Sequence, residues 1–259
     1  MQNVRVVITG VGTINAIACD ADGFAAALKQ GRCGIGPLSV FDTAGFRTRT
    51  GGEVRAFAPQ ERIPPVYYGK RMSRADAMAM VATLEALQDA GLLPLPDGLR
   101  ENTGVAIGGG AGGMLEGEAA YQRYLSGHAD TVRFSDFSAF CGASSADHMV
   151  SKLQLWGPKT TFMTACSSGA TAIGYARDLI RDGMATAMIA GGTEPLARTT
   201  YAAFNSLKAV DPEYCKPFDR NRQGMSLGEG AGARFVFTQV GLAEVVTQIS
   251  FTDCWIDHE

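Results

Sequence analysis

The sequence lacks the features that mark several large classes of protein. Its six cysteines are scattered without a Cys-x-x-Cys pair, which indicates neither a disulfide scaffold nor a zinc site. The 23 basic and 26 acidic residues leave a formal charge of −3, so nothing points to a nucleic-acid partner. The sequence contains no run of about 18 apolar residues, so it predicts no membrane span, and the N-terminus does not resemble a signal peptide. We therefore expect a cytoplasmic protein that needs no metal and no cofactor.

The overall composition is typical of a globular protein. Of the 259 residues, 46% are hydrophobic and 19% are charged, and this length suits one large domain or two small ones. Glycine is over-represented at 32 residues, without the Gly-X-Y period of collagen. Because the glycines cluster between apolar runs, we interpret them as turns where backbones approach closely.

Short apolar runs alternate with helical patterns along the chain. Ser73 followed by Asp76 resembles a capping box at the start of one helix, and Asp20 is the expected cap of another. Strands that alternate with helices favour an α/β fold whose largely parallel sheet lies between helices. The expected strands are 4–9, 103–107, 160–164, 185–190 and 233–237, and the clearest later helices are 144–156 and 167–181.

The sharpest motif is Thr-Ala-Cys-Ser-Ser-Gly, which runs from Thr164 to Gly169. An expected strand ends just before Cys166, and an expected helix begins just after it. The unpaired N–H groups and the dipole of a helix start stabilise an anion, which favours a nucleophilic thiolate there. The N–H of Cys166 could also donate to an oxyanion. The residues alone leave two hypotheses for Cys166: an activated nucleophile, or a small hydrophobic side chain in the core.

Six motifs occur in a fixed order between residues 4 and 237. They are Val7 to Gly12, Gly34 to Pro37 with Phe41-Asp42, Gly157-Pro158 with Thr164 to Gly169, Gly191 to Glu194, Pro217 to Arg220, and Gly228 to Gly232. In this order they resemble the β-ketoacyl-(acyl carrier protein) synthases of the elongating, type II kind. That family has a thiolase-like fold of two similar α/β halves, and it acts as a dimer.

The resemblance implies an acyltransferase of fatty acid or polyketide synthesis. Cys166 would take an acyl chain from acyl carrier protein. Malonyl-carrier protein would then lose carbon dioxide, and the carbanion would attack the Cys166 thioester to give a 3-oxoacyl thioester. The implied partners are acyl carrier protein and a second copy of the chain.

Three further residues acquire candidate roles from the resemblance. Lys70 and Arg71 fall near the docking site of the acidic carrier protein, and Ala111 matches a position beside the acyl tunnel. The small side chain of Ala111 hints at a wide pocket. The competing explanations are a solvated basic helix start, which would include Arg74, and simple turn chemistry in the glycine-rich run.

The sequence departs from the family pattern in its histidines. The family uses two histidines of its second half to stabilise negative charge on the malonyl thioester, in His-Gly-Thr and Gly-His motifs. No His-Gly-Thr occurs here, and the Gly-His pair at His128 precedes Cys166 and matches no catalytic position. We expect His128 and His148 to be surface or structural residues, and His258 lies one residue from the end of the sequence.

The expected organisation follows from this departure. Residues 1–240 would form the N-terminal ketosynthase domain, and residues 241–259 the truncated start of the C-terminal half. Such a chain could not complete condensation, and its uncovered apolar face would favour aggregation. The alternative function is a catalytically silent partner subunit that binds a carrier protein or a complete synthase.

Two further patterns are set aside. Gly10-Val11-Gly12 begins like a dinucleotide-binding fingerprint, but Asn15 stands where the third glycine is required. Asp219 and Glu229 could suggest an acid–base pair. We interpret both as structural carboxylates that accept hydrogen bonds from backbone amides.

Overall fold

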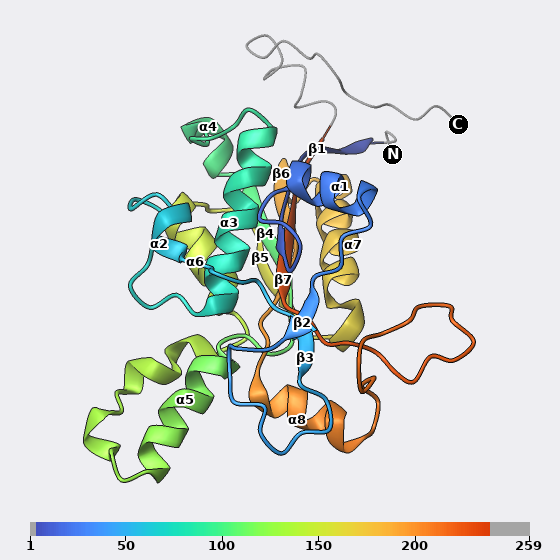
Figure 1. The fold of residues 1–259 in the computed structure, drawn as a ribbon. Coiled ribbons are helices and arrows are strands. Elements are labelled where there is room, and N and C mark those ends of the chain that lie inside the picture. Colours follow the sequence, from blue (N-terminus) through green and yellow to red (C-terminus); the bar gives the residue numbers. More distant parts are fainter. Residues whose placement is uncertain (1–3, 239–259) are drawn as a thin grey trace.

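A five-stranded sheet lies at the centre of the computed structural model, which describes residues 4–238 (Figure 1). In the order β1-β7-β6-β4-β5, β4 pairs in parallel with β5 and β6, whereas β7 is antiparallel to β6 and β1. Only β7 therefore runs against the others, and the predicted α/β fold with a mostly parallel mixed sheet is confirmed. The strands are β1 (Val6–Asn15), β4 (Thr103–Gly108), β5 (Lys159–Phe162), β6 (Ala187–Glu194) and β7 (Gly230–Thr238).

Helices cover both faces of this sheet. α3 (Arg74–Asp89) and α6 (Ser144–Leu153) lie on one face, and α7 (Ser168–Arg181) lies on the other (Figure 1). A separate pair of short strands, β2 (Ile35–Pro37) and β3 (Thr50–Gly52), is antiparallel. The other helical segments are α1 (Ala21–Lys29), α2 (Pro59–Arg62), α4 (Asp97–Arg100), α5 (Met114–Leu125), η1 (Ala129–Thr131), η2 (Phe134–Phe140), η3 (Ala165–Ser167) and α8 (Arg198–Ser206).

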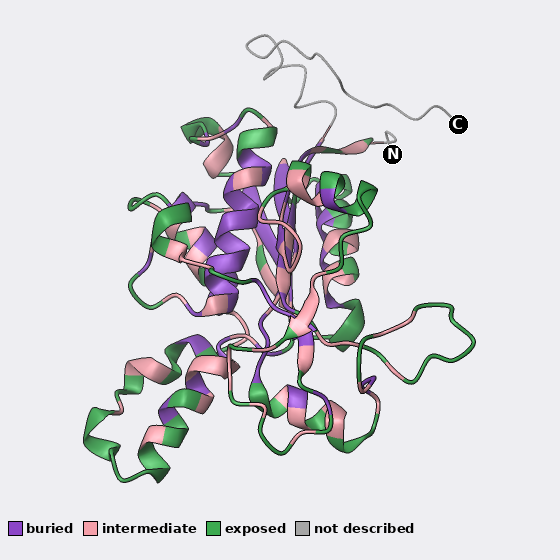
Figure 2. Cartoon of the chain, in the orientation of Figure 1, coloured by how far each residue is buried: buried purple, intermediate pink, exposed green. Residues whose placement is uncertain are grey.

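Two apolar cores form because successive side chains of a strand point to opposite faces. On β4, Val105 and Ile107 join the core beneath α3, whereas Ala106 joins the core beneath α7. The α7 core is built largely from small residues such as Ala172 and Ala176, so this helix lies close to the sheet. Figure 2 shows the buried residues concentrated along the sheet and along the faces of the helices that contact it.

A buried carboxylate fixes the start of α3. The backbone N–H of Asp76 donates to Ser73 Oγ at 3.1 Å, and the Asp76 carboxylate accepts from the N–H of Ser73 at 2.9 Å, which confirms the predicted capping box. Asp76 also accepts from Ser144 Oγ at 2.9 Å and Ser145 Oγ at 2.7 Å. One side chain thus satisfies helix-start donors and ties α6 to α3.

The edge of β1 that does not pair with β7 is covered by acidic side chains of α3. The N–H of Val11 donates to Asp89 Oδ2 at 2.8 Å, and the N–H of Thr13 donates to Glu85 Oε2 at 2.7 Å. Burial raises the pKa of Glu85 above its usual value, against the lowering effect of its backbone hydrogen bonds. The i, i+4 spacing of the carboxylates on the helix matches the i, i+2 spacing of the outward N–H groups on the strand.

Several of the glycines predicted to form turns lie instead inside strands. Gly10 and Gly12 are within β1, where methyl groups would overlap the carbonyl oxygens of Ala86 and Ala82 on α3. Gly191 is likewise within β6, and a methyl group there would overlap the Gly232 carbonyl of β7. These strands therefore extend further than predicted, because glycine lets neighbouring backbones approach closely rather than making the chain turn.

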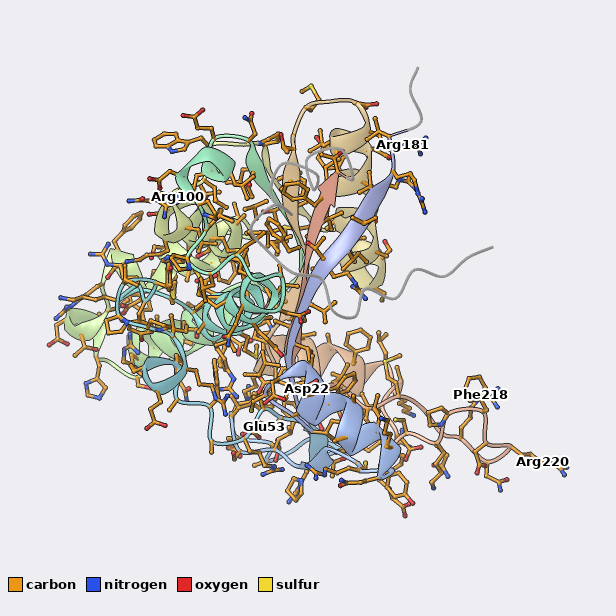
Figure 3. The ribbon with its side chains drawn as sticks, turned by 90° about the horizontal axis from the view of Figure 1, so that it is seen from above. Asp22, Glu53, Arg100, Arg181, Phe218 and Arg220 are labelled. Carbon is orange, nitrogen blue, oxygen red and sulfur yellow. The ribbon has the colours of Figure 1, made fainter. Side chains whose placement is uncertain are left out.

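Several large apolar side chains remain exposed. Phe134 is 93% exposed, Trp156 is 79% exposed, and Phe218 is fully exposed. Figure 3 shows Phe218 and Arg220 at the end of a loop that extends away from the body of the chain. Within residues 4–238, none of the helices has the length and hydropathy needed to cross a membrane.

Substitution of Gly12 by alanine should lower the free energy of unfolding by about 2 kcal/mol or more, because the new methyl group overlaps the backbone of α3. Gly174→Ala is the matched control. A methyl group at Gly174 would meet open space. Alanine should stabilise this interior position of α7 by roughly 0.5–1 kcal/mol relative to glycine. Urea unfolding of both variants measures the difference, and equal effects would contradict the proposed close packing of α3 on β1.

Candidate active site

Cys166 lies on a sharp connection between β5 and α7. Ala165, just before it, has a φ of +53°, a left-handed conformation that costs a non-glycine residue roughly 1–2 kcal/mol. η3 then forms one 3-10 turn before α7 begins at Ser168. The connection leaves the thiol exposed at the start of a helix and past the carboxyl end of a strand. This is the predicted placement of Cys166, with one tight turn inserted before the α-helix.

Hydroxyl groups brace this connection. Buried Ser168 accepts from the N–H of Thr164 at 2.9 Å and donates to the carbonyl oxygen of Ala165 at 2.7 Å. Ser167 Oγ donates to the carbonyl oxygen of Thr164 at 2.9 Å. The side chains that follow the cysteine thus hold the strained backbone that precedes it.

The residues around the thiol lie at the carboxyl ends of three adjacent parallel strands. β5 leads to Cys166, β4 leads to the glycine-rich loop that begins at Gly109, and β6 ends at Glu194. The Glu194 carboxylate accepts from the N–H of Gly110 at 2.7 Å and from the N–H of Ala111 at 2.8 Å. Because the carboxyl ends of parallel strands meet at one edge, residues far apart in sequence converge here.

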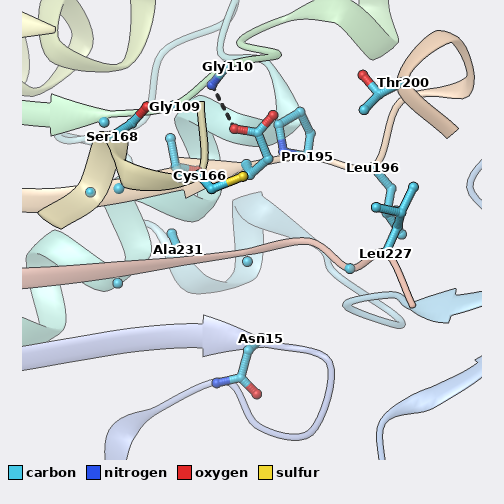
Figure 4. Close-up of a pocket in the computed structure, with 18 of the residues that line it drawn as sticks. Asn15, Gly109, Gly110, Cys166, Ser168, Pro195, Leu196, Thr200, Leu227 and Ala231 are labelled. Atoms are coloured by element: carbon cyan, nitrogen blue, oxygen red, sulfur yellow. Dashed lines mark hydrogen bonds between the residues drawn. The ribbon is translucent and has the colours of Figure 1, made fainter. Parts of the chain in front are cut away.

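Cys166 lines a cavity of about 650 Å³ with largely apolar walls (Figure 4). Among the described residues that line it, Glu194 is the only charged one, and there is no histidine, lysine or arginine. The apolar side chains come from distant parts of the chain, among them Phe24, Tyr201 and Leu227. The cavity suits an apolar group attached to a thiol.

A second cavity of about 540 Å³ contains the predicted cationic residues Lys70 and Arg71. Both are exposed, and Arg123 and Arg133 line the same cavity. Arg123 is paired with Asp136 at 2.5 Å. This cavity therefore has a predominantly cationic wall that contains Lys70 and Arg71.

Arg74 does not belong to this cationic surface, which corrects the grouping expected from the sequence. It turns inward and binds Glu229 through Nε at 2.8 Å and Nη2 at 2.6 Å. Burial opposes the charged form of Arg74, but the hydrogen bond and ion pair with Glu229 raise its pKa. Glu229 also accepts from the N–H groups of Val54 and Leu196, so its predicted structural role is confirmed.

Glu116 lies in the wall of the cationic cavity. Its Oε1 accepts from the N–H of Arg74 at 2.7 Å, and among the described residues its buried Oε2 has no hydrogen-bond partner. Burial raises the pKa of Glu116 above its usual value, and the backbone hydrogen bonds only partly offset this. Nearby Asp76 acts in the same direction as burial.

The remaining candidates among the described residues do not line the cysteine cavity. His128 is exposed beside η1, and His148 Nε2 lies 3.7 Å from Asp76 Oδ2, as expected for surface and structural histidines. Asp219 accepts from the N–H of Asn221 at 2.6 Å, as expected of a structural carboxylate. Ala111 is buried beside the cavity rather than in its lining, so its role at an acyl pocket stays a prediction. Residues 241–259, with His258, lie outside the described residues.

Sequence reasoning missed two features of the site. No signal marks the left-handed Ala165, because alanine rarely adopts that conformation. Glu194 was part of a quoted motif, but its contact with the glycine-rich loop depends on strand order. Among the described residues, no group of three or more histidine, cysteine, aspartate or glutamate side chains is placed to hold a metal ion.

Comparisons with known proteins agree with this geometry. Residues 3–239 match the sequence model described as "Beta-ketoacyl synthase, N-terminal domain". The chain is 35% identical over 254 residues to the tetracenomycin polyketide synthase ketoacyl synthase alpha subunit of Streptomyces glaucescens, covering 92% of this chain and 58% of that protein. It is 34% identical over 241 residues to 3-oxoacyl-(acyl-carrier-protein) synthase 2 of Synechocystis sp., covering 90% of this chain and 57% of that protein.

The same likeness is found among solved structures. The ishigamide ketosynthase/chain length factor superposes with a TM-score of 0.84 at 29% identity, covering 94% of this chain and 60% of that chain. The thiolase-like layering predicted from the motifs is therefore confirmed. The chain spans only 57–58% of the length of the two curated relatives.

Cys166 should react with iodoacetamide faster than the other cysteines, because it is exposed at a helix start, where unpaired N–H groups favour an anion. Timed labelling followed by peptide mass spectrometry measures each rate. Cys33 and Cys141 are also exposed and serve as internal controls for access. Labelling of Cys166 no faster than these two would contradict activation by the turn.

Glu116→Gln should reduce the pH dependence of stability. A raised pKa means that the folded chain binds this proton more tightly, so the free energy of unfolding falls as pH rises from 4.5 through the raised value. The variant lacks this loss, and its stability relative to the natural chain should rise over the same interval. Urea unfolding from about pH 4 to about pH 8 tests this, and parallel curves would contradict it.

Proposed function

This chain belongs to the beta-ketoacyl synthase family through its N-terminal domain, and we propose that it carries the acyl-accepting half of a condensing enzyme. The observation that carries the proposal is an exposed thiol on a strained strand-to-helix turn, inside an apolar cavity. Such a thiol can hold an acyl chain as a thioester. The substrate class is an acyl chain carried by acyl carrier protein, in fatty acid or polyketide synthesis.

Acyl transfer would begin at the sulfur of Cys166. The thiolate attacks the carbonyl carbon of the acyl thioester, the new carbon–sulfur bond forms, and the bond to the carrier sulfur breaks. The carrier leaves as a thiolate and takes up a proton. Negative charge develops on the carbonyl oxygen during attack, and the N–H of Cys166 is the proposed donor to it.

Condensation would follow on the acylated cysteine. The malonyl thioester loses carbon dioxide, and the electron pair of the broken carbon–carbon bond attacks the acyl carbon. Cys166 leaves as a thiolate, and the product is a 3-oxoacyl thioester on the carrier. The described lining of the cavity has no cationic or histidine donor for the malonyl oxygen. We propose that such donors come from sequence corresponding to the part of the relatives that this chain does not match.

Lys70 and Arg71 are the proposed docking residues for the carrier protein. Both are exposed in a cavity that also contains Arg123 and Arg133, and this cationic surface complements an acidic partner. Arg74 is not proposed to take part, because its guanidinium is held by Glu229. We propose that Ala111 leaves room for the acyl chain, because among the amino acids only glycine has a smaller side chain.

A second copy of the chain is the proposed partner at β5. Within residues 4–238, β5 is an edge strand with one side unpaired, and edge strands favour pairing with another strand. Met163, which follows β5, is 60% exposed. The proposed location is the cytoplasm, where thiols stay reduced.

The second candidate function is a silent partner subunit that binds a carrier protein or a complete synthase. The observation that favours it is the absence of histidine from the described cavity lining. The retained Cys166 favours the enzyme. Binding of acyl carrier protein without acyl transfer would support the silent subunit.

Incubation with an acyl carrier protein that bears a saturated acyl chain should add the mass of the acyl group to Cys166. The Cys166→Ser variant should gain none. The double variant Lys70→Glu, Arg71→Glu should slow the transfer by about 10-fold at low salt, because electrostatic steering of the acidic carrier is lost. Intact-mass and peptide spectrometry measure both.

The matched control reverses two exposed charges elsewhere, at Lys29 and Arg32, in one double variant. Its transfer rate should stay close to that of the natural chain. Equal slowing in both double variants would contradict local docking at Lys70 and Arg71. Acylation of the serine variant at another residue would contradict Cys166 as the acceptor.

A further inference from the structure

Glu194 places a negative charge in the wall of the cavity that contains Cys166. Of the described residues that line this cavity, it is the only charged one, and the surrounding walls are largely apolar. Low-polarity walls screen a charge less than water does, so the field of Glu194 extends further across the cavity. A reagent that approaches Cys166 through this space meets that field.

The carboxylate cannot easily turn away. Its two oxygens accept separate hydrogen bonds from consecutive backbone N–H groups, Gly110 at 2.7 Å and Ala111 at 2.8 Å (Figure 4 marks the bond at Gly110). The glycine-rich loop is itself tied to β5, because the N–H of Gly109 donates to the carbonyl oxygen of Phe162 at 3.1 Å. β5 also leads to Cys166. The charge and the thiol are therefore held by one hydrogen-bonded framework.

We propose that Glu194 determines the charge of the group that Cys166 accepts. The fixed carboxylate disfavours an electrophile that carries its own negative charge and leaves a neutral acyl thioester unaffected. This inference rests on the proposed acyl acceptance at Cys166 and deepens it by naming the excluded substrate class. An acyl chain that ends in a carboxylate would be rejected at the loading step, and an uncharged chain would be accepted.

The test compares two small alkylating reagents that differ in charge. Iodoacetate is an anion and iodoacetamide is neutral, and each transfers its carbon to the thiolate with loss of iodide. The ratio of their rates at Cys166 isolates the charge of the surroundings, because the nucleophilicity of the thiol cancels. In the natural chain the iodoacetate to iodoacetamide ratio should be lower at Cys166 than at exposed Cys141.

Glu194→Gln removes the charge and keeps the shape. It should raise the ratio at Cys166 by roughly 3- to 10-fold, with no change at Cys141. The matched control is Glu118→Gln. Glu118 also accepts from two consecutive N–H groups, Arg198 at 2.8 Å and Thr199 at 2.6 Å, and it does not line the cavity. This control should leave the ratio at Cys166 unchanged.

Salt provides a test that does not depend on folding of the variant. Added sodium chloride screens the carboxylate, so the ratio in the natural chain should rise at Cys166 more than at Cys141. An unchanged ratio in Glu194→Gln, or equal ratios at Cys166 and Cys141 in the natural chain at low salt, would overturn the charge role. Slow labelling of Cys166 by both reagents would instead contradict the proposed nucleophile, so the two failures are distinguishable.

Discussion

The start of α7 rests directly on the backbone of the sheet, and the arrangement around Cys166 depends on that contact. A methyl group on Gly108 would overlap the backbone of Ser168, and one on Gly192 would contact the Cα of Gly169 at 3.4 Å. Without side chains at these strand positions, the first turn of the helix can reach the sheet. The connection from β5 passes through the left-handed Ala165, and the exposed Cys166 after it lines the cavity.

The sequence carried enough information for the layers of the fold, the caps of α1 and α3, and the strand-to-helix setting of Cys166. These features depend on local periodicity and on short-range hydrogen bonds, such as the reciprocal pair of Ser73 and Asp76. The order of the motifs was enough to identify the family. The lengths of the strands were not predictable in the same way, because glycine was interpreted as a turn signal. Its actual role at Gly10, Gly12 and Gly191 depends on which neighbour packs against each strand.

The partners of the charged residues could likewise not be predicted without the three-dimensional arrangement. The direction of Arg74 is decided by Glu229, which lies 155 positions later in the chain. The contact of Glu194 with the glycine-rich loop requires β4 and β6 to be neighbours, as their parallel register of Gly108 with Gly192 establishes. A motif can identify such residues as unusual, but their partners follow from strand order.

The two outer strands of the central sheet differ in how they can meet other molecules. The outward N–H groups of Val11 and Thr13 on β1 are occupied by the carboxylates of α3, whereas β5 has an open side within the described chain. Within residues 4–238, another strand can therefore be added more readily at β5 than at β1. If two copies joined through β5, each remaining end would be a blocked β1, and growth would stop at the pair. In such a pair, the carboxylates of one helix would hinder further growth at β1.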